Sequence, residues 1–480
     1  MADLWIGGAA AAGSGGRLAV TDPASGEPVD EVPEATAADV DAAVAAAADA
    51  FGTWRRVDAA ERAGHLRALA DAAEAAAGEL VALLTREQGK PTLEAQGELR
   101  HFLGGLRYYA EAATKVQGSY QELPSQFGPA YGLVVRRPIG VVGAVTPWNF
   151  PLTLLGNKLG PALAAGNTVV AKPAETTPLT TLRVAELAGE AGLPPGVLNV
   201  VTGGPPTGEA LVAHPGVRRV AFTGQTATGR RIMELAGPAL KHVSLELGGS
   251  DPTIVLDDAD LDAAVKNIQI GRYWNCGQAC LAPKRAFVQA GVYDAFVERL
   301  AGRVGRYEPG PGSTRAEKPR LRIGPLHTAE QRELLAAQLK EAVDRGAKVV
   351  VGGEAAEGPG HFFQPAVVVD APPDSRLATE EVFGPVLPVW RVEDLDEAIG
   401  RANDTAYGLG SSIWTRDAVA IDRATRELEA GVTWVNQLHY GFDELPFGGT
   451  KQSGLGREHG LQALEEYTEL KSVVVGGLSG

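Results

Sequence analysis

Short apolar runs that alternate with helix-like stretches constrain the fold of this chain more than any other feature of its sequence. One series lies at residues 139–145, 168–172, 197–201, 218–223 and 242–247. A second series lies at residues 253–256, 285–289, 347–351, 386–392, 411–415 and 431–436. This alternation is typical of repeated βαβ units, whose strands pair in parallel because each crossover helix returns the chain to the same end of the sheet. The sequence therefore predicts two α/β domains with mostly parallel, doubly wound sheets.

The segment before the first series has a helical pattern. Thr36 is a possible N-cap for the Ala-rich stretch that follows it, and charge-dotted stretches at 59–87 and 93–113 continue the pattern. We expect a layer of helices there. Residues 119–138 are polar and contain Pro and Gly, with a β-like end, which indicates an excursion from the main body. The tract 307–321 is predicted to be a loop.

Charge and composition exclude several classes of protein. The chain has 44 Lys plus Arg against 59 Asp plus Glu, a net charge of −15, which disfavours nucleic acid and anionic membranes as partners. No run approaches the roughly 18 to 20 apolar residues of a membrane span, and the N-terminus lacks the basic start of a secretory leader. Two cysteines in 480 residues cannot form a disulfide framework, so we expect a cytoplasmic protein.

The two cysteines, Cys276 and Cys280, lie four positions apart in the stretch YWNCGQAC. Their spacing is not the Cys-x-x-Cys of redox sites, so we expect no catalytic dithiol. The eight histidines form no His-x-x-x-His pair and none lies beside the cysteines, so we expect no metal site. From the spacing alone, the two thiols are either small buried residues or a nucleophile with a bystander.

Seven motifs occur in order along the chain. They are TPWNFP (146–151), AKPAETTP (171–178), FTGQTATG (222–229), LELGGSDP (245–252), NCGQAC (275–280), EEVFGPV (380–386) and PFGGTKQSGLGREHG (446–460). This ordered set resembles the NAD(P)-dependent aldehyde dehydrogenase superfamily over essentially the whole chain. The resemblance implies an oxidoreductase that converts a small-molecule aldehyde into a carboxylic acid, with Cys280 as the nucleophile and Cys276 as the bystander.

The resemblance also implies an aldehyde dehydrogenase-like α/β fold in three parts. Residues 1–119 and 139–248 would form a Rossmann-like coenzyme-binding domain, and residues 249–455 an α/β catalytic domain. A small bridging β element, from residues 120–138 and 468–480, would pair between subunits. A homodimer or homotetramer is therefore expected.

Three residues match the catalytic positions of the family. A thiolate at Cys280 would attack the aldehyde carbon, and the side-chain amide of Asn149 would stabilise the oxyanion together with the backbone N–H of Cys280. Glu246 would be the general base that directs water onto the thioester. Lys158 and Glu458 match positions that relay protons in some relatives, with solvated surface charges as the alternative reading.

The cofactor residues follow from the same resemblance. The turn 224–229 resembles the family's phosphate-facing turn, where the next helix offers its first N–H groups to a pyrophosphate, although Gln225 stands where the family usually has serine. Lys172 and Glu175 resemble the residues that hold the adenosine ribose. A carboxylate there would repel a 2′-phosphate, so NAD is favoured over NADP. The implied cofactor set is Thr146, Pro147, Trp148, Lys172, Pro173, Glu175, Gly204, Gly208, Phe222, Thr223, Gly224, Gln225, Gly229, Leu247, Glu381 and Phe383.

The resemblance places seven residues around the aldehyde: Phe150, Leu154, Asn157, Trp274, Leu281, His439 and Phe442. Relatives that oxidise succinic semialdehyde carry arginines at the positions of Asn157 and Trp274, which bind the distant carboxylate. Here one residue is a neutral amide and the other an indole, so we expect an uncharged apolar or aromatic aldehyde. A semialdehyde is the alternative, because Arg107, Arg272 or His439 could supply a charge. A non-catalytic binding protein on the same scaffold is a further alternative.

Overall fold

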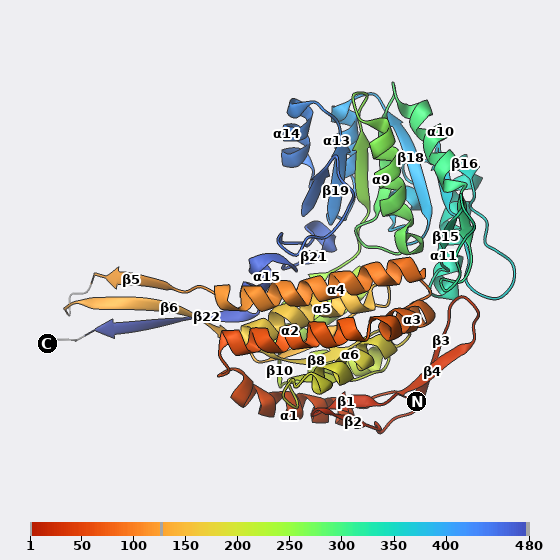
Figure 1. Cartoon of the computed structure of the whole chain (residues 1–480). Helices are drawn as coiled ribbons and strands as arrows, with labels where there is room; N and C mark the ends of the chain where they lie inside the picture. The colour runs from red at the N-terminus through yellow and green to blue at the C-terminus, as the bar shows by residue number, and fades with distance from the viewer. Residues whose placement is uncertain (1, 125–127, 477–480) are drawn as a thin grey trace.

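Residues 2–124 and 128–476 are described by a computed structural model, in which they form two α/β bodies and one projecting sheet. Figure 1 shows the lower body, built from the N-terminal half, the upper body in green to blue, and three strands that extend to one side. The predicted α/β class is confirmed. Within the described residues, no helix is long and apolar enough to cross a membrane.

The predicted helical layer is present in the lower body. Its helices are α1 (Ala37–Trp54), α2 (Ala59–Ala75), α3 (Ala77–Gln88) and α4 (Thr92–Ala112). Thr36 caps α1 in a reciprocal capping box with Asp39, which satisfies two N–H groups at the helix start. The sequence predicts one helical stretch over 59–87, but the structure has two helices that meet at Ala76. The Ala76 backbone departs from helical geometry at φ −89° and ψ 13°.

The lower body contains an eight-stranded sheet in the order β2-β1-β9-β8-β7-β10-β11-β21. Its central strands are parallel and coincide with the first apolar series: β7 (Val141–Val145), β8 (Thr168–Lys172), β9 (Leu198–Val200), β10 (Val217–Thr223) and β11 (His242–Glu246). Helices link them: α5 (Pro151–Ala165), α6 (Leu179–Glu190), α7 (Pro205–Ala213) and α8 (Thr226–Ala236). Three strands near the two ends of this sheet were not predicted, because they are too short to show a pattern: β1 (Leu4–Ile6), β2 (Ala9–Ala11) and β21 (Gly454–Leu455).

The upper body contains a seven-stranded sheet in the order β16-β17-β18-β13-β12-β19-β20, in which only β16 is antiparallel to its neighbour. Its strands are β12 (Asp251–Val255), β13 (Pro283–Gln289), β16 (Lys348–Val351), β17 (Ala366–Val369), β18 (Val386–Val392), β19 (Gly410–Trp414) and β20 (Val432–Val435). Only β17 is absent from the predicted series. Its helices are α9 (Leu261–Tyr273), α10 (Tyr293–Val304), α11 (Ala329–Asp344), α12 (Arg376–Thr379), α13 (Leu395–Asn403) and α14 (Ala418–Glu427).

Several short elements complete the two bodies. They are a hairpin of β3 (Arg17–Thr21) and β4 (Pro28–Pro33), the helix α15 (Gly460–Glu466), and 3-10 turns at Ala113–Lys115, Gly237–Ala239, Trp274–Gly277 and Lys451–Ser453. The tract 307–321 is not entirely a loop. It begins with β14 (Tyr307–Pro309) and runs into β15 (Leu321–Ile323), and the two strands pair in parallel.

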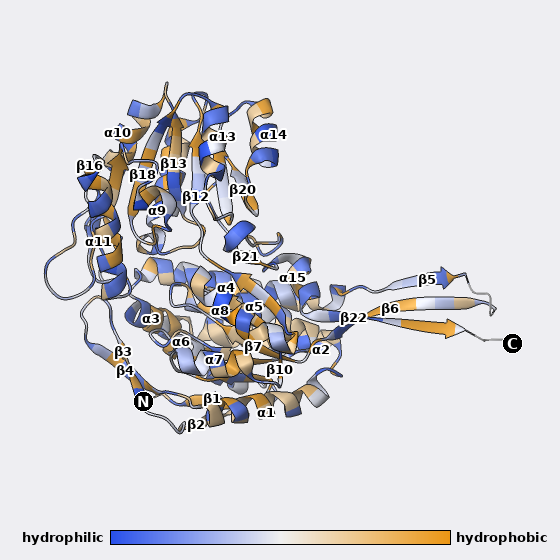
Figure 2. Ribbon diagram, turned by 180° about the vertical axis from the view of Figure 1, so that it is seen from behind, coloured by the Kyte–Doolittle hydropathy of each residue, from blue (hydrophilic) through white to orange (hydrophobic). Residues whose placement is uncertain are grey.

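The predicted β excursion forms a separate antiparallel sheet. Its strands are β5 (Ser119–Leu123), β6 (Ala130–Pro138) and β22 (Thr468–Gly476), in the order β22-β6-β5. Figures 1 and 2 show it projecting from the lower body, with hydrophobic stretches on β6 and β22. Leu470 and Val474 are 63% and 68% exposed. The bridging β element was predicted to include residues 125–127 and 477–480 as well, and these lie outside the residues that the structure describes.

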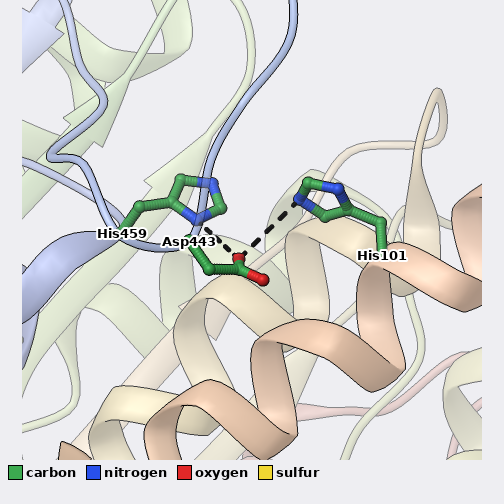
Figure 3. Close-up of side chains that lie close together, drawn as sticks. All are labelled: His101, Asp443 and His459. Carbon is green, nitrogen blue, oxygen red and sulfur yellow. Dashed lines mark hydrogen bonds and ion pairs between the residues drawn. The ribbon is translucent and has the colours of Figure 1, made fainter.

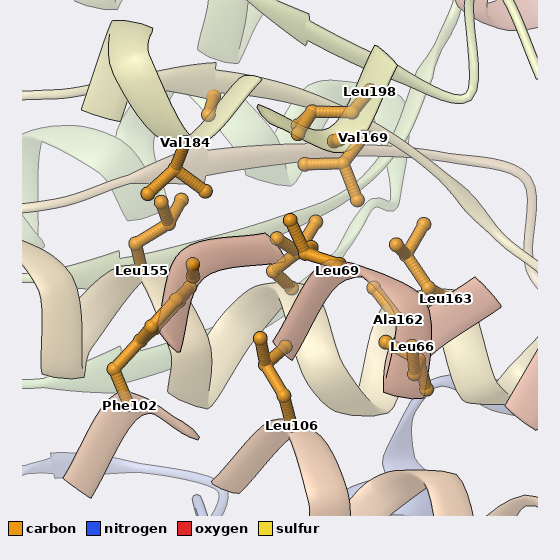
Figure 4. Packing of buried hydrophobic residues seen from close by; sticks show 14 of the residues in the cluster. Leu66, Leu69, Phe102, Leu106, Leu155, Ala162, Leu163, Val169, Val184 and Leu198 are labelled. Atoms are coloured by element: carbon orange, nitrogen blue, oxygen red, sulfur yellow. The ribbon is translucent and has the colours of Figure 1, made fainter. Parts of the chain in front are cut away.

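Close packing of α5 against α4 positions the start of α5 at the boundary between the bodies. Phe102 and Leu106 of α4 belong to the same buried hydrophobic cluster of the lower body as Leu155 and Leu163 of α5 (Figure 4). A Cβ added to Gly156 would lie 2.8 Å from Phe102, and one on Gly160 would lie 2.6 Å from Tyr109. Glycines therefore allow the two helices to approach, since any larger residue would push them apart.

Candidate active site

The predicted nucleophile lies in a turn with unusual backbone geometry. Helix α9 ends at Tyr273, and the next turn holds Asn275 and Cys276 at φ 51° and 55°. The chain then reaches Cys280, which keeps some solvent exposure and lies beside Lys284, whose Nζ donates a hydrogen bond to the Cys280 carbonyl at 2.5 Å. Desolvation raises the pKa of the Cys280 thiol to about 12, against a lowering effect of Lys284. A base is therefore needed to form the thiolate at neutral pH.

Cys276 has a different environment. Its side chain is 1% exposed and packs in the core of the upper body with Tyr273. Burial raises its thiol pKa well above the ordinary range. Both cysteines are free. A buried, protonated thiol in an apolar core acts as a packing residue.

Asn149 connects the two bodies. It follows β7 in the segment that leads into α5, and its Nδ2 donates a hydrogen bond to the backbone oxygen of Gln278 at 3.1 Å. Its own carbonyl accepts bonds from Lys90 Nζ and Asn275 Nδ2, both at 2.8 Å. These bonds hold the Asn149 amide next to the segment that leads to Cys280. Donors fixed in this way are what an oxyanion site requires.

Glu246 lies at the carboxyl end of β11, and its side chain is buried. Neither carboxylate oxygen has a hydrogen-bond partner within residues 2–124 and 128–476. Desolvation raises the pKa of Glu246 well above its ordinary value; Glu458 raises it further, and Lys158 lowers it. The Glu246 charge in turn contributes to the raised pKa of Cys280. A Cβ added to Gly249, three residues after Glu246, would lie 3.0 Å from the Cys280 carbonyl oxygen. A buried carboxylate without donors is a ready proton acceptor.

Lys158 and Glu458 form a buried pair. Lys158 Nζ lies 2.6 Å from Glu458 Oε1 and donates a second bond to Thr223 Oγ1 at 2.6 Å. Lys158 is 0% exposed and Glu458 5%, so the reading as solvated surface charges is wrong. Asn157, expected beside the substrate, donates through Nδ2 to Glu458 Oε2 at 2.9 Å. Its amide is thus already engaged in this pair.

The predicted adenosine and phosphate residues lie at the carboxyl ends of the parallel strands. Lys172 ends β8 and pairs with Glu175 at 3.6 Å, and the Glu175 side chain is 45% exposed. Gln225 occupies the N-cap position of α8 without a side-chain capping bond. The first N–H groups of α8 therefore have no side-chain cap, which suits a phosphate ligand. Gly208 of α7 packs against the Lys172 side chain, because a Cβ added to it would lie 3.8 Å away.

A second group of predicted cofactor residues lies on the upper body. Glu381 accepts a hydrogen bond from Gly249 N at 3.1 Å and pairs with Lys284 Nζ at 3.3 Å. The ring of Phe383 meets that of Trp148 edge-on, at 5.6 Å between centroids. Trp148 also stacks on His327 at 4.7 Å. His327 was not predicted, and no motif around it signals this contact. The half-exposed Glu175 carboxylate, the uncapped start of α8 and the Phe383 ring together fit a nicotinamide dinucleotide.

The seven predicted substrate residues differ in exposure and contacts. Lys90 Nζ lies 4.0 Å from the Phe150 ring centroid. His439 is buried, stacks on Trp434 at 4.4 Å, and binds the Leu281 carbonyl through Nδ1 at 2.8 Å. Burial lowers the pKa of His439 to about 4, so it is neutral at pH 7. Leu154 is buried, whereas Phe442 is 39% exposed and packs on Tyr440.

The predicted alternative sources of charge are engaged elsewhere. Arg107 pairs on the surface with Asp71 and Glu74. Arg272 is buried and donates to backbone carbonyls at 382–386. Arg100, which was not predicted, is exposed near Trp274: a Cβ added to Gly97 would lie 3.2 Å from the indole and 3.7 Å from the guanidinium. No ion pair involves Arg100 in the part of the chain that the structure describes.

Comparisons with known proteins agree with these motifs. Residues 10–473 match the family model described as the aldehyde dehydrogenase family. The chain is 42% identical over 463 residues to the mitochondrial succinate-semialdehyde dehydrogenase of Arabidopsis thaliana, covering 96% of this chain and 87% of that protein. It is 42% identical over 468 residues to the glutarate-semialdehyde dehydrogenase of Pseudomonas aeruginosa, covering 97% and 96%. The crystal structure of an E. coli NADP dependent enzyme matches with a TM-score of 0.95 at 40% identity, covering 99% and 98%.

Proposed function

Because the chain belongs to the aldehyde dehydrogenase family, we propose that it oxidises an uncharged apolar or aromatic aldehyde to the carboxylic acid, with NAD as the hydride acceptor and water as the acyl acceptor. The observation that carries the proposal is the meeting of three groups at the boundary between the bodies. The Glu246 charge raises the pKa of Cys280, and a Cβ added to Gly249 after Glu246 would lie 3.0 Å from the Cys280 carbonyl oxygen. Asn149 is bonded to the segment that leads to Cys280.

The first half of the reaction starts with proton transfer from the Cys280 thiol. Glu246 accepts the proton, because its carboxylate is buried without donors. The thiolate then attacks the carbonyl carbon, and the carbonyl π electrons move to oxygen. The Asn149 amide and the backbone N–H of Cys280 stabilise this oxyanion. Glu381 and Phe383 would hold a nicotinamide ring, which would accept the hydride released when the oxyanion collapses to a thioester.

The second half is hydrolysis of the thioester. Glu246 first releases the proton that it took from the thiol. It then takes a proton from water, the resulting hydroxide adds to the acyl carbon, and the Cys280 sulfur leaves as thiolate. In the buried pair, Lys158 Nζ donates to Glu458 and to the Thr223 hydroxyl. Glu458 raises the pKa of Glu246, and Lys158 lowers it. We assign to this pair the passage of the proton away from Glu246.

The preference for NAD rests on Glu175. Its carboxylate is held near Lys172 at the end of β8 and remains 45% exposed, where it can accept bonds from ribose hydroxyls and would repel a 2′-phosphate. The similar E. coli structure is described as NADP dependent. For this chain, kcat/KM with NAD is expected to exceed that with NADP.

The preference for an uncharged aldehyde rests on two polar side chains that are expected beside the substrate. Asn157 is bonded to Glu458, and His439 is neutral. A carboxylate buried there would lack a fixed cation, at a cost of several kcal/mol in effective terms. An aromatic ring, in contrast, could pack on the indole.

A semialdehyde is a second candidate, because two observations favour it. Two of the similar proteins are named succinate- and glutarate-semialdehyde dehydrogenases. Arg100 also lies next to Trp274, where its exposed guanidinium could bind a carboxylate that stays near solvent.

A substrate panel distinguishes the two candidates. NADH formation is measured with benzaldehyde, hexanal, succinic semialdehyde and glutaric semialdehyde, for the wild type and for Arg100→Gln. We expect the highest kcat/KM for benzaldehyde or hexanal and little change in Arg100→Gln. A higher kcat/KM for either semialdehyde, lost in Arg100→Gln, would establish the second candidate. The absence of NADH with every aldehyde would favour a non-catalytic protein.

The working form is proposed to be a cytoplasmic homodimer or homotetramer. The two free thiols support a reducing compartment. The projecting sheet supports an oligomer, because exposed apolar side chains on β22 are suited to a subunit contact.

A further inference from the structure

A second cluster of ionisable side chains lies where the upper body meets α4. His101 of α4, Asp443 in the loop before β21, and His459 just before α15 each direct one ligand-type atom to a common point (Figure 3). His459 Nδ1 lies 3.1 Å from Asp443 Oδ1, and His101 Nε2 lies 4.0 Å from the same oxygen. All three atoms lie within 4.8 Å of one another. Sequence spacing predicted no metal site, because these residues are far apart in the chain.

Both imidazoles are held by their other nitrogen. His101 Nδ1 lies 3.0 Å from the Tyr440 hydroxyl, and His459 Nε2 lies 3.1 Å from Asn157 Nδ2. The nitrogens that face Asp443 are the ones that a ligand would use, and His459 Nδ1 would exchange its bond to Asp443 for the ligand. Metal-binding histidines usually donate their other ring N–H to a neighbouring polar group. His101 Nδ1 can donate to the Tyr440 hydroxyl in this way, whereas His459 Nε2 accepts from the Asn157 amide, which would have to turn.

The His101 ring is not explained by a simple ion pair. At 4.0 Å its Nε2 is too far from Asp443 Oδ1 for a hydrogen bond. Asp443 Oδ1 already has one imidazole partner, His459 Nδ1, at 3.1 Å. Elsewhere on the surface, Asp41 Oδ1 has a single imidazole partner in the same way, His214 Nε2 at 3.1 Å. The second imidazole, His101, at 4.0 Å from Asp443 therefore distinguishes this cluster from a pair such as His214 and Asp41.

The backbone of His459 gives independent evidence of a special role. Its φ of 59° and ψ of 171° lie in a region that is almost restricted to glycine. The bond from Gly460 N to the Asp443 carbonyl at 2.9 Å fixes the adjoining backbone. A strained residue that presents a buried imidazole to a carboxylate and a second imidazole is typical of a functional site.

We propose that His101, Asp443 and His459 form a binding site for a zinc-type divalent cation, which fastens the 436–447 loop to α4. Two imidazole nitrogens and one carboxylate oxygen, with water as the fourth ligand, form a tetrahedral Zn²⁺ site with metal–ligand distances of about 2.0–2.2 Å. Such ligands lie about 3.3 Å apart. His101, the more exposed histidine of the two, has to move towards Asp443 to close the site.

Binding at this site has a consequence for the reaction, and this consequence rests on the proposed function. A metal on His459 Nδ1 leaves the ring hydrogen on Nε2, which must then donate to Asn157. The Asn157 amide has to turn its oxygen towards His459, so that it no longer donates to Glu458. Glu458 would lose the hydrogen bond from Asn157. Because Glu458 is assigned to the passage of the proton away from Glu246, turnover should slow.

The binding test uses Co²⁺, whose visible absorption reports four-coordinate geometry. The protein carries Cys280→Ala, so that the reactive thiolate cannot bind the ion. We expect one bound Co²⁺ per chain with intense visible bands, and affinity weaker by more than roughly tenfold in His101→Ala and in Asp443→Asn. His214→Ala, the matched histidine beside a single aspartate, should bind normally. Equal binding in His101→Ala, or no visible bands, would overturn the proposal.

The kinetic test adds Zn²⁺ to the enzyme with Cys280 intact and measures NADH formation. Micromolar Zn²⁺ should inhibit the wild type and His214→Ala, whereas His101→Ala should resist. Inhibition that persists in His101→Ala would mean that Zn²⁺ acts at the thiol, and would overturn the link to Glu458. A protein with the Co²⁺ bands but without aldehyde oxidation would disprove the proposed function and leave the metal site standing.

Discussion

Burial determines how individual residues of the candidate site behave. Glu246 and Cys280 are ordinary residue types, yet desolvation raises the pKa of both. A thiol that resists ionisation and a carboxylate that holds protons strongly make a matched donor and acceptor. Two predictions about variants and one about pH follow at this scale.

Cys280→Ala should abolish NADH formation from aldehydes while leaving NAD binding and folding intact, because no hydride moves before the thiolate attacks. Cys276→Ala should retain most activity, since Cys276 is a packing residue 1% exposed in the upper core. The measurement is kcat/KM in reducing buffer together with NAD binding by fluorescence. Equal loss of activity in the two variants would contradict the assignment.

Glu246→Gln should separate the two halves of the reaction. Thioester hydrolysis requires the general base, so the variant should accumulate acyl-enzyme and release a burst of about one NADH per active site. The amide cannot accept the thiol proton, so the burst should be slower than the wild-type first turnover. Rapid-mixing absorbance measures the burst. A variant that forms no NADH at all would show that the base is essential for attack itself.

The pH dependence of kcat should report Glu246. The group works only when ionised, and its raised pKa means that activity falls on the acid side above the ordinary Glu range of about 4.3. Glu458 contributes to the raised pKa, so Glu458→Gln should move the acid limb to lower pH. A move to higher pH would contradict this electrostatic coupling. Circular dichroism checks that Lys158, left without its partner, does not unfold the protein.

At the scale of elements, the contact between α4 and α5 supports the site. The 21-residue helix α4 supplies His101 and packs on α5, whose start follows Asn149. The sequence predicts α4 from its helical pattern, and α5 as a helix that links two of the apolar runs. It does not show the glycine contacts between them, since these depend on which faces meet.

Gly160→Ala should destabilise the protein by about 1–3 kcal/mol, because its Cβ would meet the Tyr109 ring at 2.6 Å. Gly64→Ala on α2 is the matched control: nothing lies within 4 Å of its Cβ position, so improved helix propensity should raise stability by up to about 1 kcal/mol. Thermal and urea unfolding measure both. A melting temperature for Gly160→Ala at or above that of the wild type would show that α4 can move aside without loss of stability.

At the scale of the whole molecule, the projecting sheet would leave apolar side chains in water if the protein were a monomer. Three strands extend from the body and expose Tyr120, Leu470 and Val474. A partner subunit would remove these side chains from water, which favours association at roughly 25 cal/mol per Å² of apolar area. The oligomerisation role and the domain boundaries remain predictions.

Val474→Glu should reduce the oligomer to smaller species, because it places a charge in the expected subunit contact. Val419→Glu on α14 is the control, since Val419 is equally exposed at 68% but lies on the far body. Light scattering coupled to size-exclusion chromatography gives the mass of each. An unchanged oligomer in Val474→Glu would place the subunit contact elsewhere.

The sequence by itself determined the element types and the chemistry of the candidate site. Alternation of apolar runs and helical stretches arises between neighbours in the chain, so it predicted most of the parallel strands of both sheets. It missed β17, which lies inside the upper sheet, and the short strands β1, β2 and β21. The ordered motifs identified Cys280, Glu246 and Asn149 as the groups of interest. Their identity as thiol, carboxylate and amide does not depend on folding.

Only the tertiary structure decided how those groups are charged and which residues join them. Glu458 meets Asn157 across 301 residues, and His101 meets Asp443 and His459 across comparable separations. Such contacts leave no local pattern, because pairing and desolvation depend on distances in space and not on spacing in the chain. For this reason the Lys158–Glu458 pair could be misread as surface charge, and the histidine cluster beside it had no signal before the chain was folded.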